Sequence, residues 1–246
     1  MYSDFAGVYD RLQDADYEKF ADYYEEIFKR LGIHPELVLD LACGTGNITV
    51  PMAKRGYDMI GLDISCEMLN IAREKAYEAG ESILFLNQDM SEFELYGTVD
   101  AILCALDGVN YLTEPAELEK LFRLADNYLN PGGAMIFDMN SEYKLKNILG
   151  NNTFVNEEQD IYYVWRNNYS EDTRICGFEL NFFVKNEDGT YFRFDEYQEE
   201  RAYSECEVAA AAGNTGLRMI GAYRPFSFEQ STNTDERIFF VFQKNC

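Results

Sequence analysis

Hydrophobic positions in the first part of the chain follow two alternating periods. Short apolar runs, typical of strands that are buried on both faces, occur at residues 38–41, 57–62, 83–86, 99–104 and 134–137. Between these runs, apolar residues recur every three or four positions, as they do along one side of an amphipathic helix. Strands and helices that alternate at this spacing predict a parallel sheet with right-handed crossover connections.

The pattern changes at about Asn140. Three longer segments, 161–168, 173–185 and 190–201, are rich in aromatic residues and nearly alternate between apolar and polar positions, which is typical of half-buried strands. The stretch 186–189, Asn-Glu-Asp-Gly, separates the last two segments and is a strong hairpin signal. The sequence therefore predicts an antiparallel meander inserted after the fifth strand.

The two ends of the chain complete the predicted core. Residues 2–31 show the apolar spacing of two helices. Near the other end, Ser204 and Glu207 form a capping box for an alanine-rich helix, and apolar runs at 217–223 and 238–242 predict two final strands. We therefore divide the chain into a core, residues 1–138 and 202–246, and an inserted subdomain, residues 139–201.

The composition excludes several classes of protein. The chain has 246 residues, 47% of them hydrophobic, and a formal net charge of −23. Such an acidic surface repels phosphate backbones, and the chain lacks the basic footprint that DNA or RNA binding requires. No stretch approaches the roughly 18 unbroken apolar residues of a membrane span. The segment MYSDFAGVYD at the start contains neither a basic region nor an apolar signal core. We expect a globular, cytoplasmic protein without nucleic-acid or membrane partners.

Cysteine and histidine usage favours the same interpretation. The six cysteines are scattered without a C-x-x-C pair, which suits reduced thiols in a cytoplasm. Because the chain has a single histidine, His34, and no paired cysteines, we expect no metal site.

The most informative stretch is the turn after the first strand. Residues 43–46, Cys-Gly-Thr-Gly, place two glycines one residue apart, where a missing Cβ lets the backbone approach a ligand closely. Ile48, Met52 and Ala53 follow at helical spacing. The free N–H groups at the start of such a helix point into the crevice beside the strand. Strand, turn and helix together predict a nucleotide-type binding corner.

The pattern distinguishes between two kinds of nucleotide-binding turn. A dinucleotide fingerprint, G-x-G-x-x-G, requires a third glycine where Thr49 stands and an apolar residue where Asp40 stands. The pattern D-x-A-C-G-T-G at 40–46 instead resembles motif I of the class I S-adenosylmethionine (SAM)-dependent methyltransferases. The segment Tyr-x-x-Phe-Ala-x-x-Tyr-Asp at 2–10 resembles the N-terminal segment of small-molecule methyltransferases, notably glycine N-methyltransferases and dTDP-amino-sugar N-methyltransferases. The resemblance implies an α/β fold with a Rossmann-like, seven-stranded methyltransferase sheet, an N-terminal helical cap and SAM as cofactor.

Several residues are predicted to bind that cofactor. Asp63 ends the second strand about 20 residues past the glycine turn, where a carboxylate can accept hydrogen bonds from both ribose hydroxyls. The resemblance implies that Asp89 accepts the adenine amino group and that Met90 packs on the purine. It also implies that the N-terminal segment folds over the methionine end of SAM. The full predicted set is Tyr2, Tyr9, Asp40, Ala42, Gly44, Gly46, Asp63, Ile64, Met68, Asp89, Met90 and Ala105.

The acceptor side is less defined, and no residue is assigned a catalytic role. Asp107, Asn110 and Tyr111 follow the fourth strand and are candidates for contact with a small-molecule acceptor. The Asn/Asp-Pro-Pro-Tyr/Phe motif of enzymes that methylate nucleic-acid bases is absent there. A hydroxyl acceptor normally requires a base, and His34 lies before the first strand, so a nitrogen acceptor is slightly favoured.

The inserted meander has two interpretations. Tyr162, Trp165, Arg193 and Tyr197 could roof the pocket and select the acceptor. Alternatively, the aromatic residues of the insert pack the sheet face or form the interface of a homodimer.

Two other functions are kept as alternatives. One is a nicotinamide-dependent oxidoreductase, which Thr49, Asp40 and Asp89 disfavour. The other is a non-catalytic protein that binds SAM or a protein partner.

Overall fold

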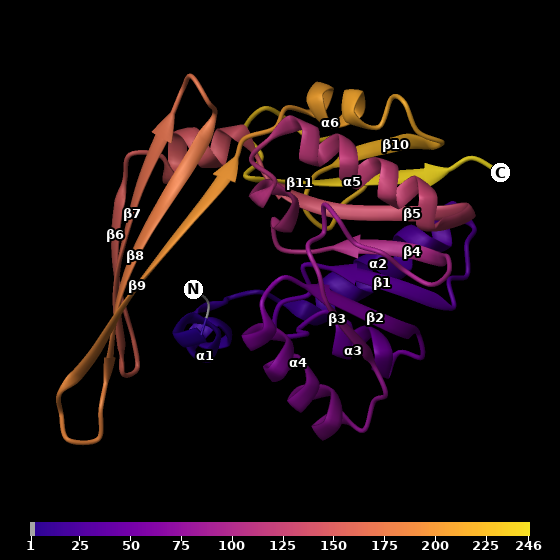
Figure 1. The fold of residues 1–246 in the computed structure, drawn as a ribbon. Coiled ribbons are helices and arrows are strands. Elements are labelled where there is room, and N and C mark those ends of the chain that lie inside the picture. The colour runs from indigo at the N-terminus through magenta and orange to yellow at the C-terminus, as the bar shows by residue number, and fades with distance from the viewer. Residues whose placement is uncertain (1–2) are drawn as a thin grey trace.

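A computed structural model describes residues 3–246 and contains two separate β-sheets (Figure 1). Tyr2, one of the predicted cofactor residues, lies outside the described residues. The larger sheet has the order β3-β2-β1-β4-β5-β11-β10, in which β1 to β5 run parallel and β11 and β10 are each antiparallel to the preceding neighbour. Its strands are β1 (Leu37–Leu41), β2 (Asp58–Asp63), β3 (Leu84–Asn87), β4 (Val99–Cys104), β5 (Leu129–Asn140), β10 (Leu217–Tyr223) and β11 (Arg237–Lys244). The predicted seven-stranded α/β core is confirmed.

Helices cover both faces of this sheet, which explains why its strands are apolar throughout. Within β1, Val38 packs on the face covered by α2, whereas its neighbours Leu39 and Leu41 pack on the opposite face beneath α5. The first face carries α2 (Tyr17–Leu31), α3 (Thr49–Lys54) and α4 (Cys66–Ala79), and the second carries α5 (Pro115–Tyr128) and α6 (Glu205–Ala211).

Polar side chains mark where these helices begin. Asp16 caps α2 by accepting a hydrogen bond from the backbone N–H of Lys19 at 3.1 Å. Ser204 accepts from the N–H of Glu207, and the Glu207 carboxylate accepts from the N–H of Ser204 at 2.8 Å, so the predicted capping box of α6 is confirmed.

Strand β5 starts earlier than predicted. The sequence suggests a turn at 131–133, but the strand runs on from the end of α5 at Tyr128 and absorbs these residues as an irregularity in its pairing with β4. A Cβ on Gly133 would lie 2.6 Å from the carbonyl oxygen of Asp100, so glycine here permits close strand approach. The strand also continues to Asn140, beyond the predicted core boundary at residue 138.

The inserted segment forms the second sheet, which is antiparallel throughout in the order β6-β7-β8-β9. It follows a π-helix, η2 (Lys144–Leu149), and consists of β6 (Thr153–Glu158), β7 (Ile161–Ser170), β8 (Ile175–Lys185) and β9 (Tyr191–Arg201). The predicted three-stranded meander and its hairpin at 186–189 are present, but β6 was missed. This strand is almost wholly exposed and polar, TFVNEE, so it lacks the alternation that identifies a half-buried strand.

Helix α1 (Ser3–Leu12) lies between the two sheets (Figure 1). Phe5 and Val8 of this helix pack with Met68 of α4 on one side and with Ile161 and Phe182 of the insert on the other. The N-terminal helical cap is therefore also the element that joins the insert to the core. Within residues 3–246, no helix is both long and apolar enough to cross a lipid bilayer.

Candidate active site

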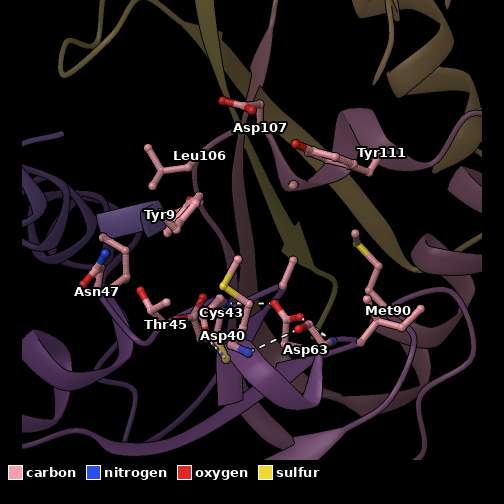
Figure 2. Close-up of a pocket in the computed structure, with 18 of the residues that line it drawn as sticks. Tyr9, Asp40, Cys43, Thr45, Asn47, Asp63, Met90, Leu106, Asp107 and Tyr111 are labelled. Atoms are coloured by element: carbon pink, nitrogen blue, oxygen red, sulfur yellow. Dashed lines mark hydrogen bonds between the residues drawn. The ribbon is translucent and has the colours of Figure 1, made fainter. Parts of the chain in front are cut away.

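A cavity of about 240 Å³ opens at the carboxyl ends of β1, β2 and β4, and α1 forms one of its walls (Figure 2). Ligands of open α/β sheets bind at this edge. The lining consists of Phe5, Tyr9, Gln13, Asp40, Ala42, Cys43, Gly44, Thr45, Asn47, Ile48, Asp63, Ile64, Ser65, Met68, Met90, Ala105, Leu106, Asp107, Gly108, Tyr111 and Gln198.

The glycine turn forms the floor of the cavity. Ala42, Gly44 and Gly46 all adopt positive φ angles, of 51°, 55° and 79°. A Cβ placed on Gly44 would meet nothing within 4 Å, so this residue leaves open space beside the backbone. A Cβ on Gly46 would lie 3.1 Å from the Cβ of Ala72, and Gly46 does not appear in the described lining. Gly46 thus serves the packing of the loop against α4, whereas Gly44 faces the cavity.

Asp63 connects the end of β2 to the glycine turn. Its Oδ2 accepts a hydrogen bond from the N–H of Gly44 and its Oδ1 accepts one from the N–H of Ser65, both at 2.8 Å. Burial raises the pKa of this carboxyl, although the backbone N–H groups act in the opposite direction. Each oxygen can accept a second hydrogen bond, so the carboxylate retains capacity for ligand hydroxyls.

Asp40 lies beneath the same turn and is almost completely buried. Its Oδ2 accepts a hydrogen bond from the Thr49 hydroxyl at 2.6 Å. Desolvation raises the pKa of the Asp40 carboxyl to about 7, because the charged form loses its hydration. The two residues that argued against a dinucleotide fingerprint therefore form one hydrogen-bonded pair.

A network of side chains fastens α1 to the glycine turn. Asp10 accepts hydrogen bonds from the Thr45 hydroxyl at 2.6 Å and from the Asn47 amide at 2.8 Å, and it pairs with Lys75 of α4 at 2.6 Å. These contacts hold Tyr9 over the cavity, where burial raises the pKa of its phenol. Tyr9 lines the cavity, and its contact with the cofactor stays a prediction. Asp10 ends the N-terminal pattern at 2–10, but the pattern does not predict that its side chain anchors α1 to the glycine turn.

The far wall follows β4. Leu106 and Asp107 adopt positive φ angles of 57° and 58°, a strained arrangement for two consecutive residues with side chains. Asp138 stabilises it, because its carboxylate accepts from the N–H groups of Leu106 at 2.9 Å and Asp107 at 3.2 Å. Arg237 pairs with Asp138 and lies 2.6 Å from Asp107 Oδ1. Sequence reasoning missed both Asp138 and Arg237, since they lie in strands far from the motif.

Two of the three acceptor-side candidates line the cavity. Asp107 and Tyr111 lie across it from Asp63, and the Tyr111 hydroxyl donates to Gln198 Oε1 at 2.9 Å (Figure 2). Asn110 does not line the cavity, so its candidacy is corrected. It is completely buried, its Oδ1 accepts from the N–H of Asn140, and its amide donates to the carbonyl groups of Asn140 and Arg201. Its hydrogen bonds join η1 (Gly108–Tyr111) to β5 and β9.

Most of the other predicted cofactor residues meet at the cavity. Ala42, Ile64, Met68, Met90 and Ala105 all belong to its lining. The described lining does not include Asp89, whose Oδ1 accepts from the N–H of Ser91 at 2.7 Å. The assignment of Asp89 to the adenine amino group stays a prediction.

The residues proposed to roof the pocket lie elsewhere. None of them occurs in the described lining, where the insert is represented by Gln198. Tyr197 is 59% exposed and lies on the other face of β9 from its neighbour Gln198. Trp165 packs on Phe154 and Phe178. Tyr162 is 39% exposed and Arg193 lies over the ring of Phe183. Which residue of an alternating strand faces the cavity depends on register, and a shift by one residue reverses it.

Comparison with known proteins identifies the family of this chain. Residues 38–133 match the family described as "Methyltransferase domain". "Putative methyltransferase YqeM" of Bacillus subtilis (strain 168) is 33% identical over 247 residues, covering 100% of this chain and 98% of that protein. The crystal structure of an S-adenosylmethionine-dependent methyltransferase from Clostridium acetobutylicum ATCC 824 has a TM-score of 0.91 and 33% identity, covering 100% of this chain and 99% of that chain.

A more distant structure shares the fold. SAM-bound CalS10, an amino pentose methyltransferase from Micromonospora echinaspora, has a TM-score of 0.76 at 20% identity, covering 100% of this chain and 98% of that chain. The fold and the site define a class I, Rossmann-like transferase. The chain belongs to the SAM-dependent methyltransferases. The predicted enzyme class and cofactor are thereby confirmed, and the nicotinamide alternative is set aside.

Proposed function

We propose that this methyltransferase transfers the methyl group of SAM to an amino group of a small molecule. The observation that supports this most directly is the charge of the cavity. Its lining includes the carboxyl groups of Asp40, Asp63 and Asp107, and among the described lining residues none is Lys, Arg or His. Such a site favours cationic ligands, which include the sulfonium of SAM and an amine that arrives protonated and loses its proton before it attacks the methyl group, and it disfavours phosphate or carboxylate acceptors.

The residues of the glycine-turn side fit the cofactor. We infer that Asp63 binds the ribose hydroxyls with its remaining acceptor capacity, and that Met90 and Ile64 flank the base. Gly44 leaves room for close backbone approach to the methionine portion, beside Ala105. When bound, SAM supplies an activated methyl group. The protein aligns the acceptor with it and excludes water, which suffices for much of the acceleration of an in-line displacement.

The engagement of the polar groups on the acceptor side supports a nitrogen acceptor over a hydroxyl. The Asp107 carboxylate is engaged by Arg237, and the Tyr111 hydroxyl donates to Gln198. Burial raises the pKa of the Tyr9 phenol, so it is protonated at neutral pH. A hydroxyl acceptor would need a group that removes its proton as the methyl group is transferred, whereas an amine has only to lose a proton near neutral pH. The name of the structural neighbour CalS10, an amino pentose methyltransferase, is compatible with this proposal.

The test is methyl transfer from labelled SAM to matched acceptor pairs. Each pair consists of an amine and the alcohol of the same skeleton, for example an amino sugar and its parent sugar, with phenols as a separate group. We expect label only in amine members. Transfer to the alcohol or phenol members, with the amines unlabelled, would contradict the nitrogen assignment and leave the SAM assignment intact.

A further inference from the structure

Asp107 occupies the N-cap position of η1, but its side chain does not cap this helix. An aspartate at an N-cap usually accepts a hydrogen bond from a backbone N–H of the first turn. Here the side chain forms no such bond, and Asp107 has a left-handed backbone conformation with a φ of 58°. Its carboxylate is instead directed to a partner elsewhere in the chain and to the cavity that Asp107 lines.

That partner is Arg237 of β11, which lies 130 residues further along the chain. Its side chain is 19% exposed and bridges two carboxylates. Nη2 donates to Oδ1 of Asp107 at 2.6 Å, and Nη1 pairs with Asp138. Burial opposes the charge of the guanidinium, but the two carboxylates outweigh it and raise the pKa of Arg237. One guanidinium therefore faces two carboxylates, which leaves negative charge in excess beside the cavity.

The contact between Arg237 and Asp107 adds orientation to a loop that is already held by Asp138. The Asp138 carboxylate accepts the N–H groups of Leu106 and Asp107 and also pairs with Arg237. The second contact of Arg237 instead fixes the side chain of Asp107. It engages Oδ1, whereas Oδ2 forms no hydrogen bond within residues 3–246. The carboxylate is held at one oxygen, and the other oxygen can accept a hydrogen bond from a ligand.

The negative charge of Asp107 acts inside the cavity. Burial raises the pKa of the Tyr9 phenol, and the charge of Asp107 is the next largest cause of that increase. Tyr9 lines the cavity from α1, on a different wall from Asp107. Because the described lining contains no Lys, Arg or His, a positive charge that forms at the acceptor end meets a carboxylate and no competing cation.

Methyl transfer to an amine creates such a charge. The lone pair of the neutral amine forms the new N–C bond, while the S–C bond breaks and its electron pair passes to sulfur. The sulfonium becomes a neutral thioether, and the nitrogen becomes an ammonium that later releases a proton to water. Positive charge thus moves from sulfur to nitrogen. A carboxylate beside the nitrogen stabilises the transition state more than it stabilises the neutral amine.

We propose that Arg237 is a positioning residue for methyl transfer: by holding Oδ1 of Asp107, it presents Oδ2 to an N–H of the neutral acceptor amine. Asp107 accepts this hydrogen bond and does not remove a proton. The proposal rests on the function proposed above, because only a nitrogen acceptor gains the lasting positive charge that Asp107 stabilises. It gives a role to an arginine that no sequence motif connects with the site.

The experiment compares Arg237→Lys with Arg224→Lys. A lysine keeps the charge but lacks the planar fork that bridges two carboxylates. Arg224 also pairs with two carboxylates, those of Glu229 and Asp235, but its side chain is about half exposed and it lies outside the described lining. Initial rates of methyl transfer from labelled SAM are measured with glucosamine, propylamine and methylamine.

We expect Arg237→Lys to lower kcat about 10- to 100-fold with little change in the KM of the amine. The reason is that the lost interaction becomes strong only as charge develops on the nitrogen. Arg224→Lys should retain the kcat of the wild type. Calorimetric titration with S-adenosylhomocysteine should give the same affinity for all three proteins.

A double-mutant cycle with Asp107→Asn distinguishes positioning from a purely structural role. If Arg237 acts through Asp107, Asp107→Asn should lower kcat about as much as Arg237→Lys, and the double variant should lose no more than either single variant. Asp107→Asn leaves Arg237 and Asp138 paired one to one, so its thermal unfolding should match that of the wild type.

Unchanged kcat in Arg237→Lys, or losses that add in the double variant, overturn the proposal. If the amines are methylated in either case, only the role of Arg237 fails. If the wild type labels the parent alcohols instead of the amines, the nitrogen acceptor fails and the role of Arg237 fails with it. A wild type that labels none of the amines also contradicts the proposal, because methylamine is small enough to reach Asp107 whatever the shape of the natural acceptor.

Discussion

The two ends of the cavity are built in different ways. At the cofactor end, the glycine turn, Asp63 and Ser65 lie within about one βαβ unit, and their hydrogen bonds close on neighbouring backbone groups. At the acceptor end, Asp107, Arg237 and Gln198 come from three distant parts of the chain, and much of their interaction is between charged side chains. One end depends on local geometry, and the other depends on contacts that β9 and β11 make with the region after β4.

The largest effect is expected from breaking the acceptor end at its buried ion pair. Asp138→Ala removes the acceptor of two backbone N–H groups. It also removes one of the two carboxylates that pair with Arg237 and leaves Asp107 as the other. We expect a loss of about 3–5 kcal/mol in the free energy of unfolding, because removing one partner of a buried ion pair leaves the other charge poorly compensated. Urea unfolding measures this loss. The exposed Asp58→Ala serves as control, and a loss below about 1 kcal/mol for Asp138→Ala would contradict a supporting role for this pair.

Because Asp40 is buried beneath the glycine turn, the free energy of unfolding should depend on pH. The folded protein holds the proton of Asp40 up to pH about 7, whereas the unfolded chain releases it near the ordinary value of 3.8. Stability contributed by this proton is present below the unfolded pKa and is lost as the pH rises to about 7. Between pH 5 and 7, the ligand-free wild type should lose about 2 kcal/mol more than Asp40→Asn, measured by urea unfolding. Parallel pH profiles would show that Asp40 is not the group responsible.

A comparable effect on binding is expected from Asp63. Replacing Asp63 with Asn should weaken the binding of SAM by about 1–3 kcal/mol, since the ribose hydroxyls lose a charged hydrogen-bond acceptor. Calorimetric titration with SAM provides the measurement. Asp58→Asn, at the opposite end of the same strand, should bind SAM as the wild type does. Unchanged affinity in Asp63→Asn would place the ribose elsewhere.

The smallest effect should come from the contact that fastens α1 to the glycine turn. Asp10→Asn retains the size of the side chain but removes the ion pair with Lys75. The side chains of Asp10 and Lys75 are each about one-third exposed. Because such pairs are partly screened, we expect a loss of about 1 kcal/mol or less in S-adenosylhomocysteine binding and faster proteolysis within α1. Asp14→Asn, an exposed residue just after α1, is the matched control. Identical cleavage rates in the two variants would argue against Asp10 as the fastening residue.

More of the core than of the acceptor side could be predicted from the sequence. Apolar periodicity predicted the existence of β1 to β5, because strands buried on both faces leave a continuous signal, and near-alternation predicted the insert. It missed β6, which is exposed, and misplaced the start of β5, where the Pro-Gly-Gly stretch is absorbed into a strand irregularity. It predicted the cofactor side from a local pattern, and it named Tyr197 among four residues that could roof the pocket, whereas the register places Gln198 in the described lining.

By itself, the sequence determined the parts of this protein whose causes are local: the glycine turn, the acid that ends β2, the helix caps and the hairpin at 186–189. Only the tertiary structure decided which side chains of the insert face the cavity, that Asn110 is buried in a structural junction, and that Arg237 and Asp138 hold the loop after β4. The physical reason is the range of the interactions. Backbone conformation and capping depend on residues a few positions apart, whereas burial, ion pairing and strand facing depend on contacts between distant segments, such as that between Asp107 and Arg237, which are 130 residues apart.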